Sequence, residues 1–92
     1  MKIYKYTIEK FVDKQLIKVP VGAKFLSLQT QNNIPCLWFL VNENETVDTT
    51  IPIFTIGTGQ PIHWSITTMT FLGTYQLFDG ELIYHVFGDM PV

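Results

Sequence analysis

The stretch "TYQLFDGELIYHVF", residues 74–87, carries the clearest structural signal in this sequence of 92 residues. Asp79-Gly80 separates two runs of aromatic and β-branched residues, and an Asp-Gly pair in this setting is the strongest short signal for a β-hairpin. A two-residue turn also fixes the pairing register. We therefore expect Leu77 to lie opposite Leu82. The pairs expected further from the turn are Gln76 with Ile83, Tyr75 with Tyr84 and Thr74 with His85.

This register divides the hairpin into two faces, because side chains alternate along a strand. One face is almost wholly apolar and is expected to belong to the core: Tyr75, Leu77, Leu82, Tyr84 and Val86. The other face mixes polar and apolar groups: Thr74, Gln76, Ile83, His85 and Phe87. We expect this second face to be a half-buried interface or ligand surface, with Gln76, His85 and Phe87 as candidate interface residues.

The rest of the chain repeats short β-type runs separated by turn residues, and no segment sustains a helical period. "IEKFVDKQ" is predicted to join the first two strands as a hairpin, "QNN" to be a plain turn, and the acidic "NENETVD" to be a mobile loop. Strands are expected at residues 2–9, 14–19, 23–31, 35–41, 49–56, 68–78 and 81–87.

The run "IPCLWFLV", residues 34–41, is apolar on both sides, and a strand of this kind is covered on both faces. The cover comes from a second sheet or from a neighbouring subunit, which makes Trp38 a candidate interface residue. Pro52 is predicted to lie at an edge strand or a bulge, because proline donates no ladder hydrogen bond. The sequence therefore predicts one all-β domain, residues 1–92, built as a small antiparallel sandwich or barrel-like sheet of about six to seven strands.

The composition is 47% hydrophobic and 15% charged, where ~25% charged residues is usual. This leaves little polar cover for the surface, so we expect a homo-oligomer or another partner. The one cysteine, Cys36, is predicted to be a small buried hydrophobe, and a chain without a possible intrachain disulfide fits a reducing cytosol. No run resembles a signal peptide or a membrane helix, so no membrane association is expected.

The charges are divided unevenly along a chain of net charge −2. All six lysines lie within residues 1–24, which carry a net +4, whereas the remainder carries six acidic residues and no lysine. This asymmetry is typical of head-to-tail assembly or of steering an anion. The simpler interpretation is that lysines protect two exposed edge strands. Since the chain has no arginine, sequence-specific nucleic-acid binding is not expected.

The stretch "TIGTGQPIHW", residues 55–64, is the one segment that suggests a ligand loop. Backbone N–H groups in a glycine turn can hold an anion, and a histidine beside a tryptophan can stack on a flat ligand. A phosphate loop, however, is followed by a helix or contains Gly-Lys-Ser/Thr, whereas Pro61 follows here. A plain turn between strands is therefore the simpler interpretation. The candidate ligand-binding residues are Gly57, Thr58, Gly59, Gln60, His63 and Trp64.

Catalytic and metal chemistry have no support in the sequence. Two histidines and one cysteine provide no metal-ligand spacing, and no cofactor motif is present. Cys36 lies in the most apolar run, where a reactive thiolate is disfavoured. No nucleophile–histidine–acid motif occurs. We therefore expect no enzyme activity, no metal and no cofactor.

The order of several short motifs resembles a family of small, uncharacterised proteins of bacteriophages and prophages. The motifs are the opening "IYKY", "PVGAK", "CLW", "GTGQP", "LGT" and the closing "HVF", and together they span nearly the whole chain. "HWSITTMT", residues 63–70, does not match the pattern. The resemblance implies no activity, but it implies a small viral protein made in the cytoplasm of an infected bacterial host.

In that setting, our first hypothesis is a non-catalytic accessory protein that counters a host defence by binding. Two modes of binding remain open: sequestering a nucleotide-like signal, and inhibiting a host protein. The alternative is a structural or assembly protein of the virion, in which the apolar faces pack into a larger array. A small hydrolase acting on a defence signal is a third possibility, and the absence of a catalytic motif argues against it.

Overall fold

The computed structural model describes residues 1–90 and consists almost entirely of β-structure. Its elements are β1 (Lys2–Thr7), β2 (Lys14–Pro20), β3 (Lys24–Gln31), β4 (Ile34–Val41), β5 (Asp48–Gly57), α1 (Trp64–Thr67), β6 (Thr70–Leu77) and β7 (Leu82–Gly88). All seven predicted strands are present, and each observed strand end lies within two residues of the predicted one. The all-β prediction is confirmed, and the single turn of helix at α1 is too short to show a helical period in the sequence.

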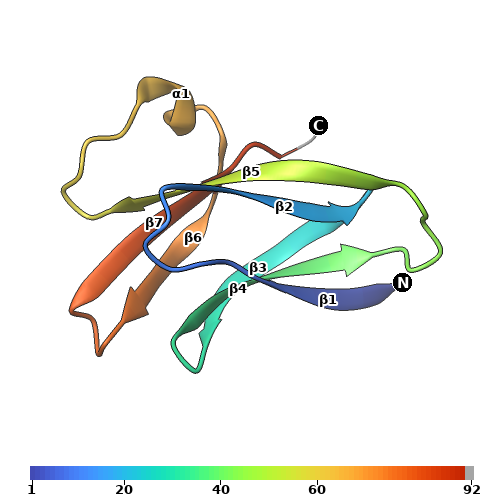
Figure 1. The fold of residues 1–92 in the computed structure, drawn as a ribbon, viewed down its shortest axis with the longest axis horizontal. Helices are drawn as coiled ribbons and strands as arrows, with labels where there is room; N and C mark the ends of the chain where they lie inside the picture. Colours follow the sequence, from blue (N-terminus) through green and yellow to red (C-terminus); the bar gives the residue numbers. More distant parts are fainter. Residues whose placement is uncertain (91–92) are drawn as a thin grey trace.

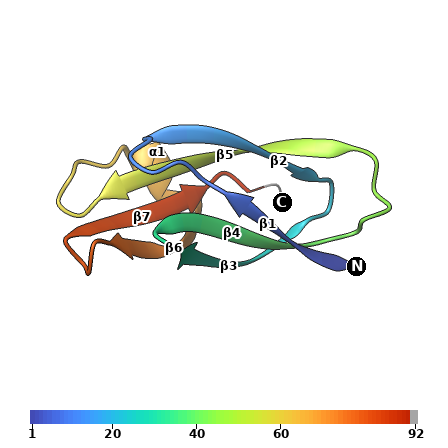
Figure 2. The same cartoon turned by 60° about the horizontal axis from the view of Figure 1, so that its bottom comes forward.

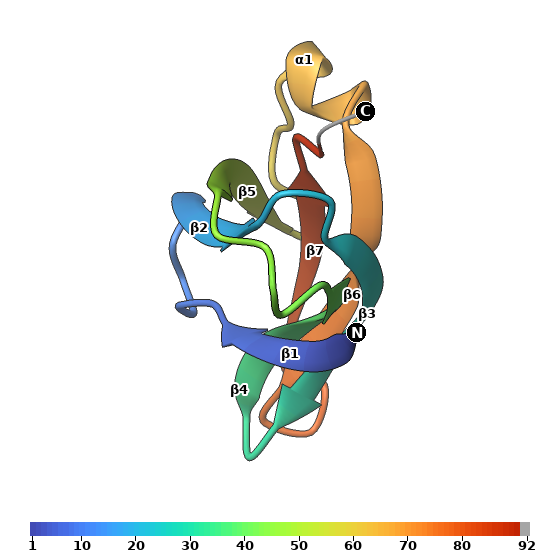
Figure 3. The same ribbon diagram turned by 90° about the vertical axis from the view of Figure 1, so that its right-hand side faces the viewer.

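The strands form two antiparallel sheets that pack as a sandwich (Figures 1 and 2). One sheet has three strands in the order β1-β4-β3, and the other has four in the order β2-β5-β7-β6. Figure 3 shows the two sheets crossing in projection, with β3 beside β6. Within residues 1–90, no helix is long and apolar enough to cross a membrane.

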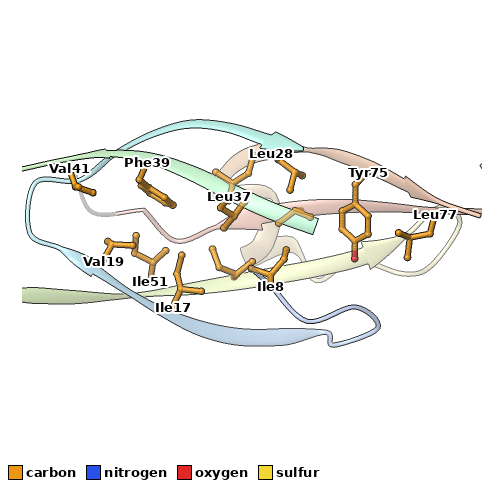
Figure 4. Packing of buried hydrophobic residues seen from close by; sticks show 13 residues of the cluster. Ile8, Ile17, Val19, Leu28, Leu37, Phe39, Val41, Ile51, Tyr75 and Leu77 are labelled. Atoms are coloured by element: carbon orange, nitrogen blue, oxygen red, sulfur yellow. The ribbon is translucent and has the colours of Figure 1, made fainter. Parts of the chain in front are cut away.

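The core lies between the two sheets, where the inward faces of the strands meet (Figure 4). Phe39 is fully buried in this core and makes edge-on ring contacts at centroid distances of 5.6 Å with both Tyr6 and Phe25. Burial of these apolar faces is the main force that stabilises a sandwich of this size. The buried residues of the hydrophobic cluster are Ile8, Ile17, Val19, Leu28, Leu37, Phe39, Val41, Ile51, Ile53, Leu72, Tyr75, Leu77 and Val86.

The hairpin of residues 74–87 has the predicted register. Leu77 lies opposite Leu82, and the next three pairs follow in step as far as Thr74 and His85. The predicted core face points inward and the mixed face points out of the sandwich. Asp79 and Gly80 have φ angles of 55° and 88°, as the turn favoured by an Asp-Gly pair requires. Phe78 also has a positive φ, of 53°, which is uncommon for a bulky residue and is not indicated by the sequence.

The predicted hairpin between the first two strands is wrong. β1 pairs with β4, and β2 pairs with β5, so the segment between them crosses from one sheet to the other. A positive φ of 63° at Phe11 redirects the chain in this crossing. Both strands are nevertheless at sheet edges, and both carry lysines, as the charge pattern predicts.

The predicted edge position of Pro52 is also wrong, because β5 lies between β2 and β7. The ladder between β5 and β7 begins only at Ile53, opposite Gly88. One residue earlier, the carbonyl of Pro52 accepts the N–H of Asp89 at 3.0 Å. Proline is tolerated here because its missing N–H falls where the ladder ends.

Candidate functional site

The segment "GTGQ" forms a tight four-residue turn at the end of β5. The N–H of Gln60 donates to the carbonyl of Gly57 at 3.1 Å, and Gly59 has a φ of +84°, a conformation that favours glycine. The side chain of Gln60 folds back, so that its Oε1 accepts the N–H of Gly57 at 2.8 Å. A Cβ at Gly57 would meet Oε1 at 2.9 Å, and this close approach explains the first glycine.

The same hydrogen bonds bear on the anion-binding interpretation of the loop. The N–H of Gly57 donates to the Oε1 of Gln60, and the N–H of Gln60 donates to the carbonyl of Gly57. The N–H of Thr58 donates to the carbonyl of Ile83 at 3.1 Å. Three of the four amides of the turn are therefore satisfied internally. A phosphate cradle needs several amides that point at the ligand, so this turn is poorly suited to hold one.

His85 ties the turn to the neighbouring strands. Its Nε2 lies 2.7 Å from the hydroxyl of Thr58, and its Nδ1 lies 3.0 Å from the hydroxyl of Thr74 on β6. Both ring nitrogens are thus hydrogen-bonded, and a hydroxyl can accept or donate in each pair. The candidate loop and the candidate interface residue His85, assigned separately from the sequence, belong to one network.

An open hollow of about 270 Å³ lies beside this network on the outer face of the four-stranded sheet. It brings four of the six predicted ligand-binding residues together with two of the four predicted interface residues. Its lining is Ile56, Gly57, Thr58, Gly59, Gln60, Ile62, Phe71, His85 and Phe87. We call it the aromatic hollow, because the rings of Phe71 and Phe87 lie 5.2 Å apart between centroids along one side.

Ile56, Ile62 and Phe71 are the members of this hollow that the sequence did not single out. Phe71 would face the core if side chains alternated regularly back from Tyr75. A bulge between Phe71 and Gly73 shifts the alternation by one residue, so Leu72 is buried and Phe71 is 54% exposed. Gly73, with a φ of +146°, is the one sequence signal for this bulge.

His63 and Trp64 do not line the hollow. The Nδ1 of His63 lies 3.2 Å from the N–H of Ser65, which donates to it, and 2.7 Å from the Ser65 hydroxyl. His63 is therefore the N-cap of α1. Trp64 is 72% exposed, with its ring centroid 5.7 Å from that of His63. The structure places this pair on the connection that arches over one end of the four-stranded sheet (Figures 1 and 3).

Two further predicted residues lie apart from the hollow. Trp38 is on the outer face of the three-stranded sheet, half-buried, with the Nζ of Lys5 5.9 Å from its ring centroid. Gln76 is exposed on β6, two residues beyond Thr74 on the outer face of the other sheet. The predicted interface residues therefore divide between the two sheets.

Three other hollows surround Gln60. The largest, of about 530 Å³, is lined by Asp13, Lys14, Phe54, Thr55, Ile56, Gln60, Pro61 and Ile66. A hollow of about 110 Å³ lies next to it, and another of about 250 Å³ lies towards the turn of the β6–β7 hairpin. Among residues 1–90, no group of three or more potential metal ligands comes together.

The fold and site define a small antiparallel β-sandwich protein with hollows arranged around one glycine turn. Over residues 1–91, the chain matches the model of the family described as "Domain of unknown function (DUF7352)", and it belongs to that family. No curated protein and no solved structure shows a significant match.

Proposed function

We propose that this chain is a non-catalytic binding protein that docks a protein of the bacterial host through the aromatic hollow. In the phage setting implied by the sequence motifs, it counters a host defence, and it acts in the cytoplasm of the infected cell. The observation that carries the proposal is the aromatic hollow itself, an uncharged surface beside a turn whose amides are largely satisfied.

The chemistry of the hollow favours a protein target over a phosphorylated signal. Its lining contains no lysine and no acidic residue, and the chain has no arginine. An anionic ligand usually requires charged donors or several free amides. An apolar or aromatic side chain of a partner protein, by contrast, gains from burial against Phe71, Phe87 and Ile62.

The test uses two exposed phenylalanines that differ in position. Phe71 lines the hollow and is 54% exposed, whereas Phe78 lies at the hairpin turn outside it and is 51% exposed. The protein is expressed in bacterial strains that each carry one anti-phage defence system, and the plating of a phage restricted by that system is measured. We expect the wild type and Phe78→Glu to restore plating, and Phe71→Glu to fail.

The proposal is abandoned if Phe71→Glu restores plating as well as the wild type does. Circular dichroism of both variants serves as the folding control, because substitution of an exposed side chain is expected to change the free energy of unfolding by about 0.5 kcal/mol or less. If Phe78→Glu fails together with Phe71→Glu while both remain folded, the contact lies elsewhere than the hollow.

A further inference from the structure

The edges of the two sheets differ in how they are covered. On one side of the sandwich, β3 lies beside β6, and a Cβ added at Gly73 on β6 would approach the Cδ2 of Leu28 on β3 to 3.2 Å. These two edges therefore cover each other. The remaining edges are β1 and β2, and each pairs with a single strand among residues 1–90. An uncovered edge strand presents a row of N–H and C=O groups that can pair with another chain.

The free backbone groups of β1 belong to alternate residues. Directly after β1, the N–H of Ile8 donates to the carbonyl of Pro35 on β4 at 3.0 Å, which continues the pairing register of the two strands. Because hydrogen-bonded residues alternate in an antiparallel ladder, the even-numbered residues of β1 point their backbone groups at β4. The N–H and C=O groups of Ile3 and Lys5 therefore point away from the sheet.

The side chains of β1 include exposed apolar groups as well as lysines. Ile3 is 61% exposed and Tyr4 is 38% exposed, and only Tyr6 is half-buried along this strand. Lysines commonly keep edge strands from pairing. Their effect depends on which residues they would face, since like charges directly opposite each other are destabilising.

Hydrogen bonding limits how two copies of β1 can pair as antiparallel strands about a two-fold axis. The outward-pointing residues of one copy must lie opposite those of the other, so the axis passes through a residue. An axis at Lys5 would place two lysines opposite each other, and an axis at Ile3 would pair only residues 1–5. An axis at Tyr4 pairs residues 1–7, which include the whole of β1.

The charges of β1 are compatible with an axis at Tyr4. In this register Lys2 lies opposite Tyr6 of the second copy and Lys5 lies opposite Ile3, so neither lysine directly faces another. Burial, and to a smaller extent the nearby carboxylate of Asp48, raises the pKa of Tyr6. The register therefore brings Lys2 of one copy towards a negative charge of the other, which is favourable.

The charges of β2, by contrast, oppose the same kind of pairing. Its even-numbered residues point their backbone groups outwards, because the carbonyl of Asp13, just before β2, accepts the N–H of Thr55 on β5. An axis at Leu16 would then place Lys14 directly opposite Lys18 of a second copy. Lysines therefore protect the edge at β2 and leave the edge at β1 able to pair.

We propose that two copies of this chain pair through β1, so that their three-stranded sheets join into one continuous antiparallel sheet, with Tyr4 facing Tyr4 across a two-fold axis. An interface of this kind uses the same surface on both copies and closes on itself, so it produces a dimer and not an open array. It lies on the other sheet from the aromatic hollow, and the proposal does not rest on the docking of a host protein.

Cysteine cross-linking tests the register. Residues that face each other without hydrogen bonds have Cα atoms about 4.5 Å apart, a separation that suits a disulfide. Tyr4→Cys should therefore form a covalent dimer on mild oxidation. Ile3→Cys and Lys5→Cys should not, because each would lie about 8 Å from its own copy. The wild type is the control for Cys36, which is buried.

The pattern of cross-links distinguishes the registers. A covalent dimer from Ile3→Cys or Lys5→Cys in place of Tyr4→Cys would overturn the register with its axis at Tyr4. No covalent dimer from any of the three variants would overturn the interface itself.

A proline substitution tests the interface without a cross-link. Ile3→Pro removes an N–H that points out of the sheet, so the monomer keeps its ladder while the dimer loses hydrogen bonds to Lys5. We expect the dimer Kd, measured by analytical ultracentrifugation, to rise at least about tenfold. Leu16→Pro is the matched change at the free edge of β2 and should leave this Kd unchanged.

Circular dichroism checks that both proline variants are folded, and the cross-linking result decides the matter if Ile3→Pro is not. A wild type that sediments as a monomer at about 100 μM would contradict the proposal. So would a folded Ile3→Pro variant that dimerises as tightly as the wild type.

Discussion

The Oε1 of Gln60 accepts the backbone N–H of Gly57 at 2.8 Å, and this one contact holds the side chain at the point where four hollows meet. Gln60 therefore closes the turn and forms part of the wall of each hollow. A Cβ at position 57 would approach the Oε1 of Gln60 to 2.9 Å, so the Gln60 side chain would have to move and release this hydrogen bond.

A double-mutant cycle tests this pairing. Gly57→Ala alone is expected to lower the free energy of unfolding by about 1–3 kcal/mol, through steric conflict with Gln60 and loss of its hydrogen bond. In a Gln60→Ala background the same substitution should cost much less, since no side chain then opposes the added Cβ. Urea unfolding of the four proteins gives the coupling energy. Simple additivity would show that the two residues act independently.

His85 is expected to control the mobility of the turn more than the stability of the fold. His85→Leu removes the contacts with Thr58 and Thr74, so that Thr58 is then tethered to β7 through the carbonyl of Ile83. Amide hydrogen exchange at residues 58–60 should accelerate about tenfold, while core amides keep their protection. Gln76→Leu, on the same outer face, is the control. Equal exchange rates in the two variants would contradict the tether.

The raised pKa of Tyr75 predicts that the protein loses stability at alkaline pH. Burial of its side chain, with a smaller contribution from Tyr84, raises its pKa to about 12. The folded protein therefore holds this proton more tightly than the unfolded chain, whose tyrosines titrate near ~10. The stabilisation is complete below about pH 10 and is lost as the pH rises towards 12.

Tyr75→Phe should reduce this alkaline loss, and it should not destabilise the protein at pH 7, because the buried hydroxyl has no partner among residues 1–90. The midpoint of urea unfolding between pH 8 and pH 12 provides the measurement. Tyr6, whose pKa burial also raises, accounts for a remaining decline. An identical pH profile in the variant and the wild type would assign the alkaline loss to other groups.

Self-association distinguishes the defence antagonist from the virion alternative. The exposed apolar residues and the low charge content lead us to expect a small closed homo-oligomer. Native mass spectrometry should show one discrete multiple of the 10.6 kDa chain. Polydisperse or open-ended assemblies would favour a structural role in the particle. A strict monomer would contradict the expected homo-oligomer.

Local signals in the sequence were sufficient for strands and turns. The Asp79-Gly80 pair set the register of the last hairpin, since a short turn leaves few ways to pair its flanking strands. The partner of β1 could not be inferred in the same way. Nothing between Thr7 and Lys14 distinguishes a hairpin from a crossing to the other sheet, and β1 finds its partner β4 far along the chain. Such pairings depend on burial of whole faces rather than on a local motif.

In the candidate site, too, the features with a local sequence signal could be predicted and those without one could not. The glycine turn was evident from its composition, but the ring of Phe71 enters the hollow only because a bulge reverses the alternation of β6. His63 was predicted to stack on a ligand, whereas the structure uses it as a helix cap. The capping role depends on a single turn of helix that has no periodic signal.

The most direct test of the central claim is a calorimetric titration. The titrated partner is the host defence protein whose block on phage plating the chain relieves, and it is titrated with the wild type and with each phenylalanine variant. We expect the wild type and Phe78→Glu to bind it with affinities within about twofold of each other. Phe71→Glu should bind at least about a hundredfold more weakly, because a carboxylate would be buried against the partner. Equal affinity of all three proteins would show that the aromatic hollow is not the docking surface, and the glycine turn would then be only a corner between two strands.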